Sequence, residues 1–104
     1  MTAKGLADAD AERALRTFGR DDADYRDLYN VFEIAEGAIG GRMFTDGTVT
    51  RTEVERFTRT AQSPTVLGDA ARHGREQEQP PAKPILFEDA RDLIRRILRI
   101  WLLP

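Results

Sequence analysis

The two residues with the clearest capacity for chemistry are Arg72 and His73, which stand side by side just before Gly74. His73 is the only histidine of the chain, and a neighbouring cation favours the neutral imidazole that can act as a base. The arginine can bind a phosphate or a carboxylate. The same three residues are also ordinary at the end of a helix, where basic side chains and glycine are favoured. The residues alone leave both interpretations open.

The charge distribution adds Arg59 and Arg75 to Arg72 and His73 as candidate binding residues. Residues 37–75 hold 6 basic and 4 acidic side chains, a net charge of +2, whereas residues 1–36 hold 5 and 9, a net charge of −4. A modest positive surface around the middle of the chain is one interpretation, and a set of solvated helix faces is the other. The net charge of the whole chain, −2, argues against a general nucleic-acid binder.

Other catalytic arrangements have little support. A Ser-His-Asp set would have to use Ser63, His73 and Asp69, and their spacing does not favour a triad. The chain has no cysteine, which excludes disulfides, thiolate metal sites and a cysteine nucleophile. It has no glycine-rich phosphate loop either. We therefore expect no metal, no cofactor and no catalytic residue, unless Arg72 and His73 form a ribonuclease site.

The segment from Arg42 to Glu53 invites a calcium interpretation. Four of its residues match positions of the calcium loop of an EF-hand: Asp46, Gly47, Val49 and Glu53. Calcium also needs oxygen ligands at the first and third loop positions, and these are Arg42 and Phe44. A capped turn before a helix explains the same residues, and this is the interpretation that we favour.

Apolar residues recur at helical spacing in four segments, at about residues 6–18, 21–37, 52–61 and 86–102. This pattern predicts an all-α fold, a small up-and-down bundle of about four helices. A short hairpin is an option between the second and third helices, over residues 42–50. Asp21 is the expected N-cap of the second helix. Residues 1–20 would form an N-terminal helical extension, and residues 21–104 a single bundle domain.

The last helix is the best defined, because many apolar residues share one face: Leu86, Ala90, Leu93, Ile94, Ile97, Leu98, Trp101 and Leu102. Four arginines line its outer face: Arg91, Arg95, Arg96 and Arg99. They are either a solvated face or a contact surface for RNA or an acidic partner. Trp101, Leu102 and Leu103 crowd the end of a small domain, and exposed apolar patches of this kind mark contacts. We therefore expect a homodimer with its interface there.

The N-terminal residues lack the apolar run of a secretory signal, and arginines interrupt the longest apolar stretch, near the C-terminus. We expect no membrane association. Together with the lack of cysteine, this favours a cytoplasmic protein.

Three consecutive stretches in the second half of the chain form a pattern: ARHG, the polar loop REQEQPPAKPI and the helix LFEDARDLIRRILRIWL. This order resembles the end of a HEPN domain, a small helical bundle. LYNVFEIAEGAIGG is similar to the long early helix of such domains, so the resemblance covers roughly residues 21–103. RNA cleavage in that family is associated with an arginine several residues before the histidine. Val66, Leu67 and Gly68 occupy that place here, so the resemblance implies the fold without the activity.

Three functional hypotheses follow. The first is a non-catalytic HEPN-like helical module that acts through protein or RNA contacts, which the resemblance places in a bacterial or phage conflict system. The second is a metal-independent ribonuclease centred on Arg72 and His73. The third is a small inhibitor or antitoxin whose acidic N-terminal half covers a basic partner.

We expect no RNA cleavage by the purified protein, because neighbouring residues on a helix point about 100° apart and do not converge on one phosphate. Binding of the partner or of RNA should weaken in Arg72→Ala and in His73→Ala. The measurement is a gel assay of labelled RNA without added metal. Degradation that disappears in His73→Ala would establish the ribonuclease instead.

Overall fold

The computed structural model describes residues 3–62 and 84–103, with the side chains of the first helix from residue 9 onward. Four α-helices dominate this part of the chain: α1 (Ala3–Phe18), α2 (Tyr25–Ile39), α3 (Arg51–Gln62) and α5 (Phe87–Leu102). The described residues contain no strand. The expected all-α bundle of about four helices is confirmed.

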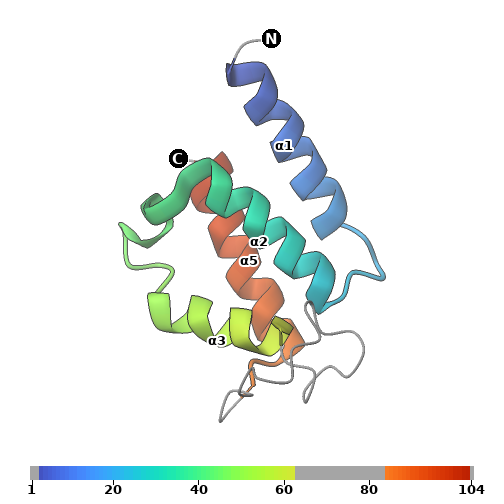
Figure 1. The fold of residues 1–104 in the computed structure, drawn as a ribbon, viewed down its shortest axis with the longest axis vertical. Coiled ribbons are helices and arrows are strands. Elements are labelled where there is room, and N and C mark those ends of the chain that lie inside the picture. Colours follow the sequence, from blue (N-terminus) through green and yellow to red (C-terminus); the bar gives the residue numbers. More distant parts are fainter. Residues whose placement is uncertain (1–2, 63–83, 104) are drawn as a thin grey trace.

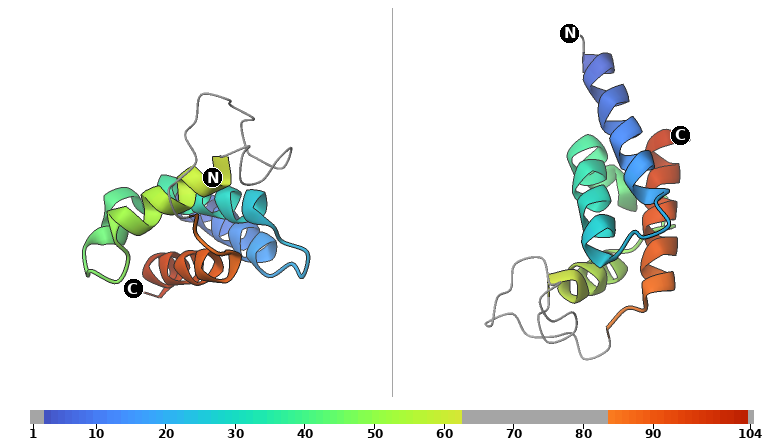
Figure 2. Two further views of the ribbon diagram at one scale, coloured as in Figure 1. Left: turned by 90° about the horizontal axis from the view of Figure 1, so that it is seen from below. Right: turned by 90° about the vertical axis from the view of Figure 1, so that its right-hand side faces the viewer.

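Three of the helices lie along the long axis of the molecule, and the fourth lies across them (Figure 1). α2 and α5 run side by side in the same direction, and α1 runs in the opposite direction (Figure 2). α3 crosses the end of the molecule at which α2 and α5 begin (Figure 1). The first turns of α1 project beyond the other helices, so only the second half of α1 packs against the bundle (Figures 1 and 2).

The segment between α2 and α3 forms a 3₁₀-helix, η1 (Gly40–Phe44), followed by a turn. The hairpin considered for residues 42–50 is not formed. Met43 and Val49 are both 1% exposed and insert into the core from the two ends of this segment. The segment therefore wraps over the bundle instead of pairing with itself. Gly40 begins it with a φ of +51°, a conformation that favours glycine.

The start of α2 differs from the sequence-based expectation. The N-cap is Asp24, three residues after the predicted Asp21. An Asp24 Oδ1 accepts from the Asp27 backbone N–H at 2.9 Å, and Asp27 Oδ2 accepts from the Asp24 N–H at 3.1 Å. This reciprocal capping box satisfies two backbone donors at once, which a single aspartate at position 21 would not do.

The core is built on the apolar face of α5. Leu93, Ile94 and Ile97 are fully buried. They meet apolar side chains of α2 and α3, of which the largest fully buried ones are Leu28, Val31 and Phe57. α1 contributes one fully buried side chain from its described part, Ala14. Phe18, at the end of α1, also packs against the core, partly buried.

The entry into α5 is held by both neighbouring helices. The Tyr25 hydroxyl of α2 donates to the Ile85 carbonyl at 2.6 Å, and the Ile85 N–H donates to Thr60 Oγ1 of α3 at 3.1 Å. Thr60 is fully buried, and its hydroxyl donates a hydrogen bond to the Arg56 carbonyl at 2.9 Å. These bonds satisfy buried polar groups and set where α5 begins.

We expect Leu93→Ala to lower the free energy of unfolding by about 2–5 kcal/mol, since it removes a fully buried side chain and leaves a cavity. Leu86→Ala, at the N-cap of the same helix, is the control, because the Leu86 side chain is 69% exposed and makes no capping hydrogen bond, and its effect should stay within about 0.5 kcal/mol. Urea unfolding followed by circular dichroism measures both. Equal effects would mean that the face of α5 that we place in the core is not buried.

Candidate functional site

The residues singled out from the sequence are only partly placed by the structure. Arg72, His73 and Arg75 lie outside the described residues, so their proximity stays a prediction. Arg59 lies on α3 with an exposed side chain. Within the described ranges, no three histidine, aspartate or glutamate side chains are grouped so that they could hold a metal ion.

The strongest polar cluster of the described residues surrounds Arg96 of α5. Its guanidinium bonds both oxygens of Glu53, with Nη2 at 2.7 Å from Oε2 and Nη1 at 3.2 Å from Oε1. Nη1 also donates to the Thr48 carbonyl at 2.7 Å, and Nε donates to Asp92 at 3.0 Å. One side chain thus joins α5, the start of α3 and the turn before it. A planar guanidinium suits such a bidentate contact.

The electrostatics of this cluster follow from its hydrogen bonds. The contact with Arg96 holds the pKa of the Glu53 carboxyl below its ordinary value of 4.5, against an opposing effect of partial burial. The same contact raises the pKa of Arg96. Both groups are charged at neutral pH, and the cluster is a structural clamp.

The calcium-like segment is the capped turn that we favoured. The backbone N–H of Thr50 donates to Glu53 Oε1 at 3.2 Å, and the Glu53 N–H donates to Thr50 Oγ1 at 3.1 Å. Asp46 accepts the Thr48 N–H at 2.9 Å. Both carboxylates that match the EF-hand pattern therefore have protein partners that explain them.

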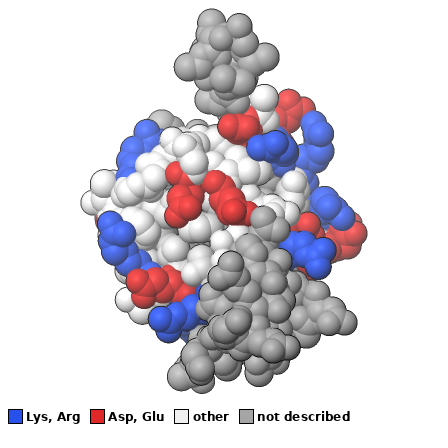
Figure 3. Space-filling view, viewed as in Figure 1, with Lys and Arg blue, Asp and Glu red and all other residues white. Residues whose placement is uncertain are grey.

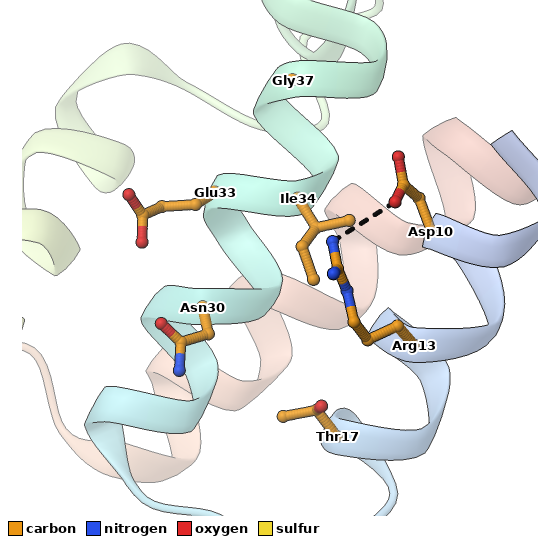
Figure 4. Close-up of a pocket in the computed structure, with 7 residues that line it drawn as sticks. All are labelled: Asp10, Arg13, Thr17, Asn30, Glu33, Ile34 and Gly37. Atoms are coloured by element: carbon orange, nitrogen blue, oxygen red, sulfur yellow. Dashed lines mark hydrogen bonds and ion pairs between the residues drawn. The ribbon is translucent and has the colours of Figure 1, made fainter. Parts of the chain in front are cut away.

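A hollow of about 620 Å³ lies between α1 and α2 (Figure 4). Arg13 of α1 extends across it beside Ile34 of α2, and its guanidinium is bound to Asp10 at 3.3 Å (Figure 4). The Arg13 and Asp10 side chains are 65% and 48% exposed. The hollow is an open, solvated gap where the two helices diverge. The charge of Arg13 is already paired with Asp10 of the same helix.

A second polar hollow of about 300 Å³ lies between α3 and α5. Its charged lining residues are of both signs: Glu53, Arg56, Asp89, Asp92 and Arg96. Most of these groups serve the clamp described above, and Arg56 donates to the Pro84 carbonyl at 2.9 Å. The hollow is a by-product of the contacts that join α3 to α5.

The third hollow has different chemistry. This α1/α5 groove, of about 290 Å³, is lined by five apolar side chains: Leu15, Phe18, Leu98, Leu102 and Leu103. The stems of Arg95 and Arg99 complete its walls. It lies where the second half of α1 runs beside the second half of α5, as the right-hand view of Figure 2 shows. Leu15 is 50% exposed and Leu103 is 73% exposed, so solvent reaches apolar side chains from both helices.

Arginines of α5 hold the Phe18 ring at the edge of this groove. The guanidinium carbons of Arg91 and Arg95 lie 5.1 and 5.9 Å from the ring centroid. At these distances a guanidinium is attracted to an aromatic face. Phe18 thus anchors the end of α1 to α5, and its ring face is covered by cations.

The groove contains two of the three residues predicted as an interface. Leu102 and Leu103 line it, whereas Trp101 packs, half-buried, against the core. Leu15 and Phe18 were not among the predicted interface residues. Both lie in the segment 6–18, where helical spacing predicts a face covered by the bundle and does not distinguish it from an exposed contact surface.

Comparison with protein-family models, with curated proteins and with solved structures finds no match to this chain. The resemblance to HEPN domains therefore stays an expectation from the sequence. No helix in the described part of the chain is long and apolar enough to cross a membrane.

We expect Glu53→Gln to lower the free energy of unfolding at pH 7 by about 1 kcal/mol, a modest value because Glu53 is 35% exposed and solvent screens the pair. The folded-state pKa of Glu53 is depressed, so its contribution is present above about pH 4.5 and is lost as the pH falls through the lowered pKa. Urea unfolding at pH 7 and near pH 3 measures the difference.

The control for this measurement is Glu55→Gln, on the exposed face of the same helix. It should have little effect at either pH. A Glu53→Gln effect that persists unchanged in acid would contradict the assignment of the stabilisation to the charged carboxylate.

Proposed function

We propose that this protein is a non-catalytic helical module that binds a protein partner at the α1/α5 groove. The observation that carries the proposal is the groove itself, where apolar side chains of two helices remain open to solvent. Concave apolar surfaces of this kind are preferred binding sites. The two polar hollows lack this character, because their charges are engaged in contacts within the bundle.

A protein partner fits the groove better than RNA does. Single-stranded RNA is bound largely by stacking of its bases on aromatic faces. The one aromatic ring that lines this groove is Phe18, and two guanidinium groups already cover it. The arginines of α5 could still hold phosphates, so RNA binding is retained as an outcome of the test.

The HEPN-like character, and with it a role in a bacterial or phage conflict system, enters this proposal through the sequence resemblance. The homodimer expected from the sequence, with its interface at Trp101, Leu102 and Leu103, is the alternative occupant of this groove, and the experiments below distinguish it from a different protein. An interaction module needs none of the catalytic geometry that Arg72 and His73 would have to supply.

The proposal is tested by affinity capture from the source cell with three forms of the tagged chain: unchanged, Leu15→Glu and Leu86→Glu. Both substitutions place a carboxylate at an exposed leucine, but only Leu15 lines the groove. We expect a protein that is retained by the unchanged chain and by Leu86→Glu and is lost from Leu15→Glu.

Thermal melts must first show that all three forms fold equally well. Capture of the same protein by all three forms, or loss of RNA alone in Leu15→Glu, would contradict a protein-binding groove.

A further inference from the structure

The charges around the α1/α5 groove specify its partner further, and this step rests on the function proposed above. We infer that the groove binds an amphipathic helix whose apolar anchors are flanked by carboxylates. Such a ligand places side chains at positions i, i+3 or i+4 and i+7 into an apolar groove. A hollow of about 290 Å³ has room for the anchors.

The argument starts from the arginines of α5 that face the groove. Neither Arg99, in the groove wall, nor Arg91, over Phe18, has a carboxylate partner among the described residues. Arg95 lies 3.7 Å from Asp92, but Asp92 is held more closely by Arg96, at 3.0 Å. Among the residues that the structure describes, no carboxylate lines the groove. Its rim therefore carries positive charge that the described part of the bundle does not neutralise.

A neighbouring hollow continues this surface and adds a negative charge to it. It shares Arg99 and Leu103 with the groove and is lined by one carboxylate, Asp46. That carboxylate accepts the Thr48 N–H, which holds the pKa of Asp46 below its ordinary value. Asp46 is therefore negatively charged at neutral pH, and on this surface the positive charge without a carboxylate partner among the described residues is confined to the groove, at Arg91 and Arg99.

A second copy of the chain is a poor occupant for this groove. In a two-fold symmetric dimer the same surface faces itself, which would bring the Arg95 and Arg99 side chains of both copies together. The acidic side chains that Figure 3 shows near the middle of the face over α2 include none that line the groove.

The shape of the groove favours a helix as the ligand over a flat anionic surface such as a membrane. Leu98, at its floor, is 5% exposed, whereas Leu15 and Leu103, at its sides, are 50% and 73% exposed. Side chains of a ligand helix can descend between those walls, as anchor residues do in protein interfaces. The arginines at the rim then meet the flanking carboxylates and select the partner by charge.

The test is a titration of the full chain with synthetic helical peptides of about 16 residues, roughly four turns long. The probe peptide carries leucines at positions i, i+3 and i+7 and three flanking glutamates. The matched peptide has glutamine in place of each glutamate. We expect the acidic peptide to bind about tenfold more tightly than the neutral one, a preference that decreases at high salt.

Two charge reversals complete the design. Arg99→Glu should abolish the preference for the acidic peptide. Arg26→Glu changes the net charge equally, on an exposed side chain in the first turn of α2, and should leave the preference unchanged. Melting curves confirm the fold of both variants.

The outcomes separate the two proposals. Equal binding of both peptides, lost in Leu15→Glu, would overturn the acidic partner but preserve the interaction module. No binding of either peptide, with binding instead to RNA oligonucleotides or to phosphatidylserine vesicles, would overturn both. A dimer in solution that Leu103→Glu dissociates would overturn the acidic partner in favour of a second copy.

Discussion

The structure depends on one constraint, the burial of the apolar face of α5. Leu93, Ile94 and Ile97 are fully buried, and each fully buried large side chain contributes about 1.5–3 kcal/mol before entropy is subtracted. A chain of 104 residues has little other material with which to stabilise a core. The remaining helices are therefore placed by the part of α5 that each covers. α2 follows it lengthwise and α3 crosses its start (Figure 1).

The polar contacts hold this arrangement in one register. Arg96 joins α5 to Glu53 and to the turn before α3, across 43 residues of sequence. Tyr25 and Thr60 hold the chain where it enters α5. Apolar burial is non-directional, whereas hydrogen bonds form only within a narrow range of distance and angle. The apolar face thus drives association, and the bonds determine how far each helix slides along its neighbour.

The fold could be predicted from the sequence because the apolar residues of α2, α3 and α5 repeat at helical spacing, which is local information. The cap of α2 was placed wrongly at Asp21, although the reciprocal spacing of Asp24 and Asp27 was readable. The capped turn that includes Glu53 was predicted, and its bonds to Thr50 confirm it. The contact of Glu53 with Arg96 was not predicted, because no local pattern reveals a contact over 43 residues of sequence.

The candidate site was less predictable for the same reason. Leu102 and Leu103 stood out as apolar residues at the end of a helix, but the groove exists only because Leu15 and Phe18 lie opposite them. Helical spacing identifies a face that will be covered and does not say how completely. The 50% exposure of Leu15 depends on how α1 and α5 pack against each other, which no local pattern encodes.

The position of α1 in one wall of the groove has a thermodynamic consequence. Among the described side chains of α1, Ala14 alone is fully buried, so we expect α1 to detach in a partial unfolding step that leaves the α5 core intact. When α1 is detached, the groove lacks the wall formed by Leu15 and Phe18, and a ligand loses its contacts with that wall. The apparent affinity is then the intrinsic affinity reduced by the docked fraction of α1. Ligand binding and α1 docking are thus linked equilibria, and each strengthens the other.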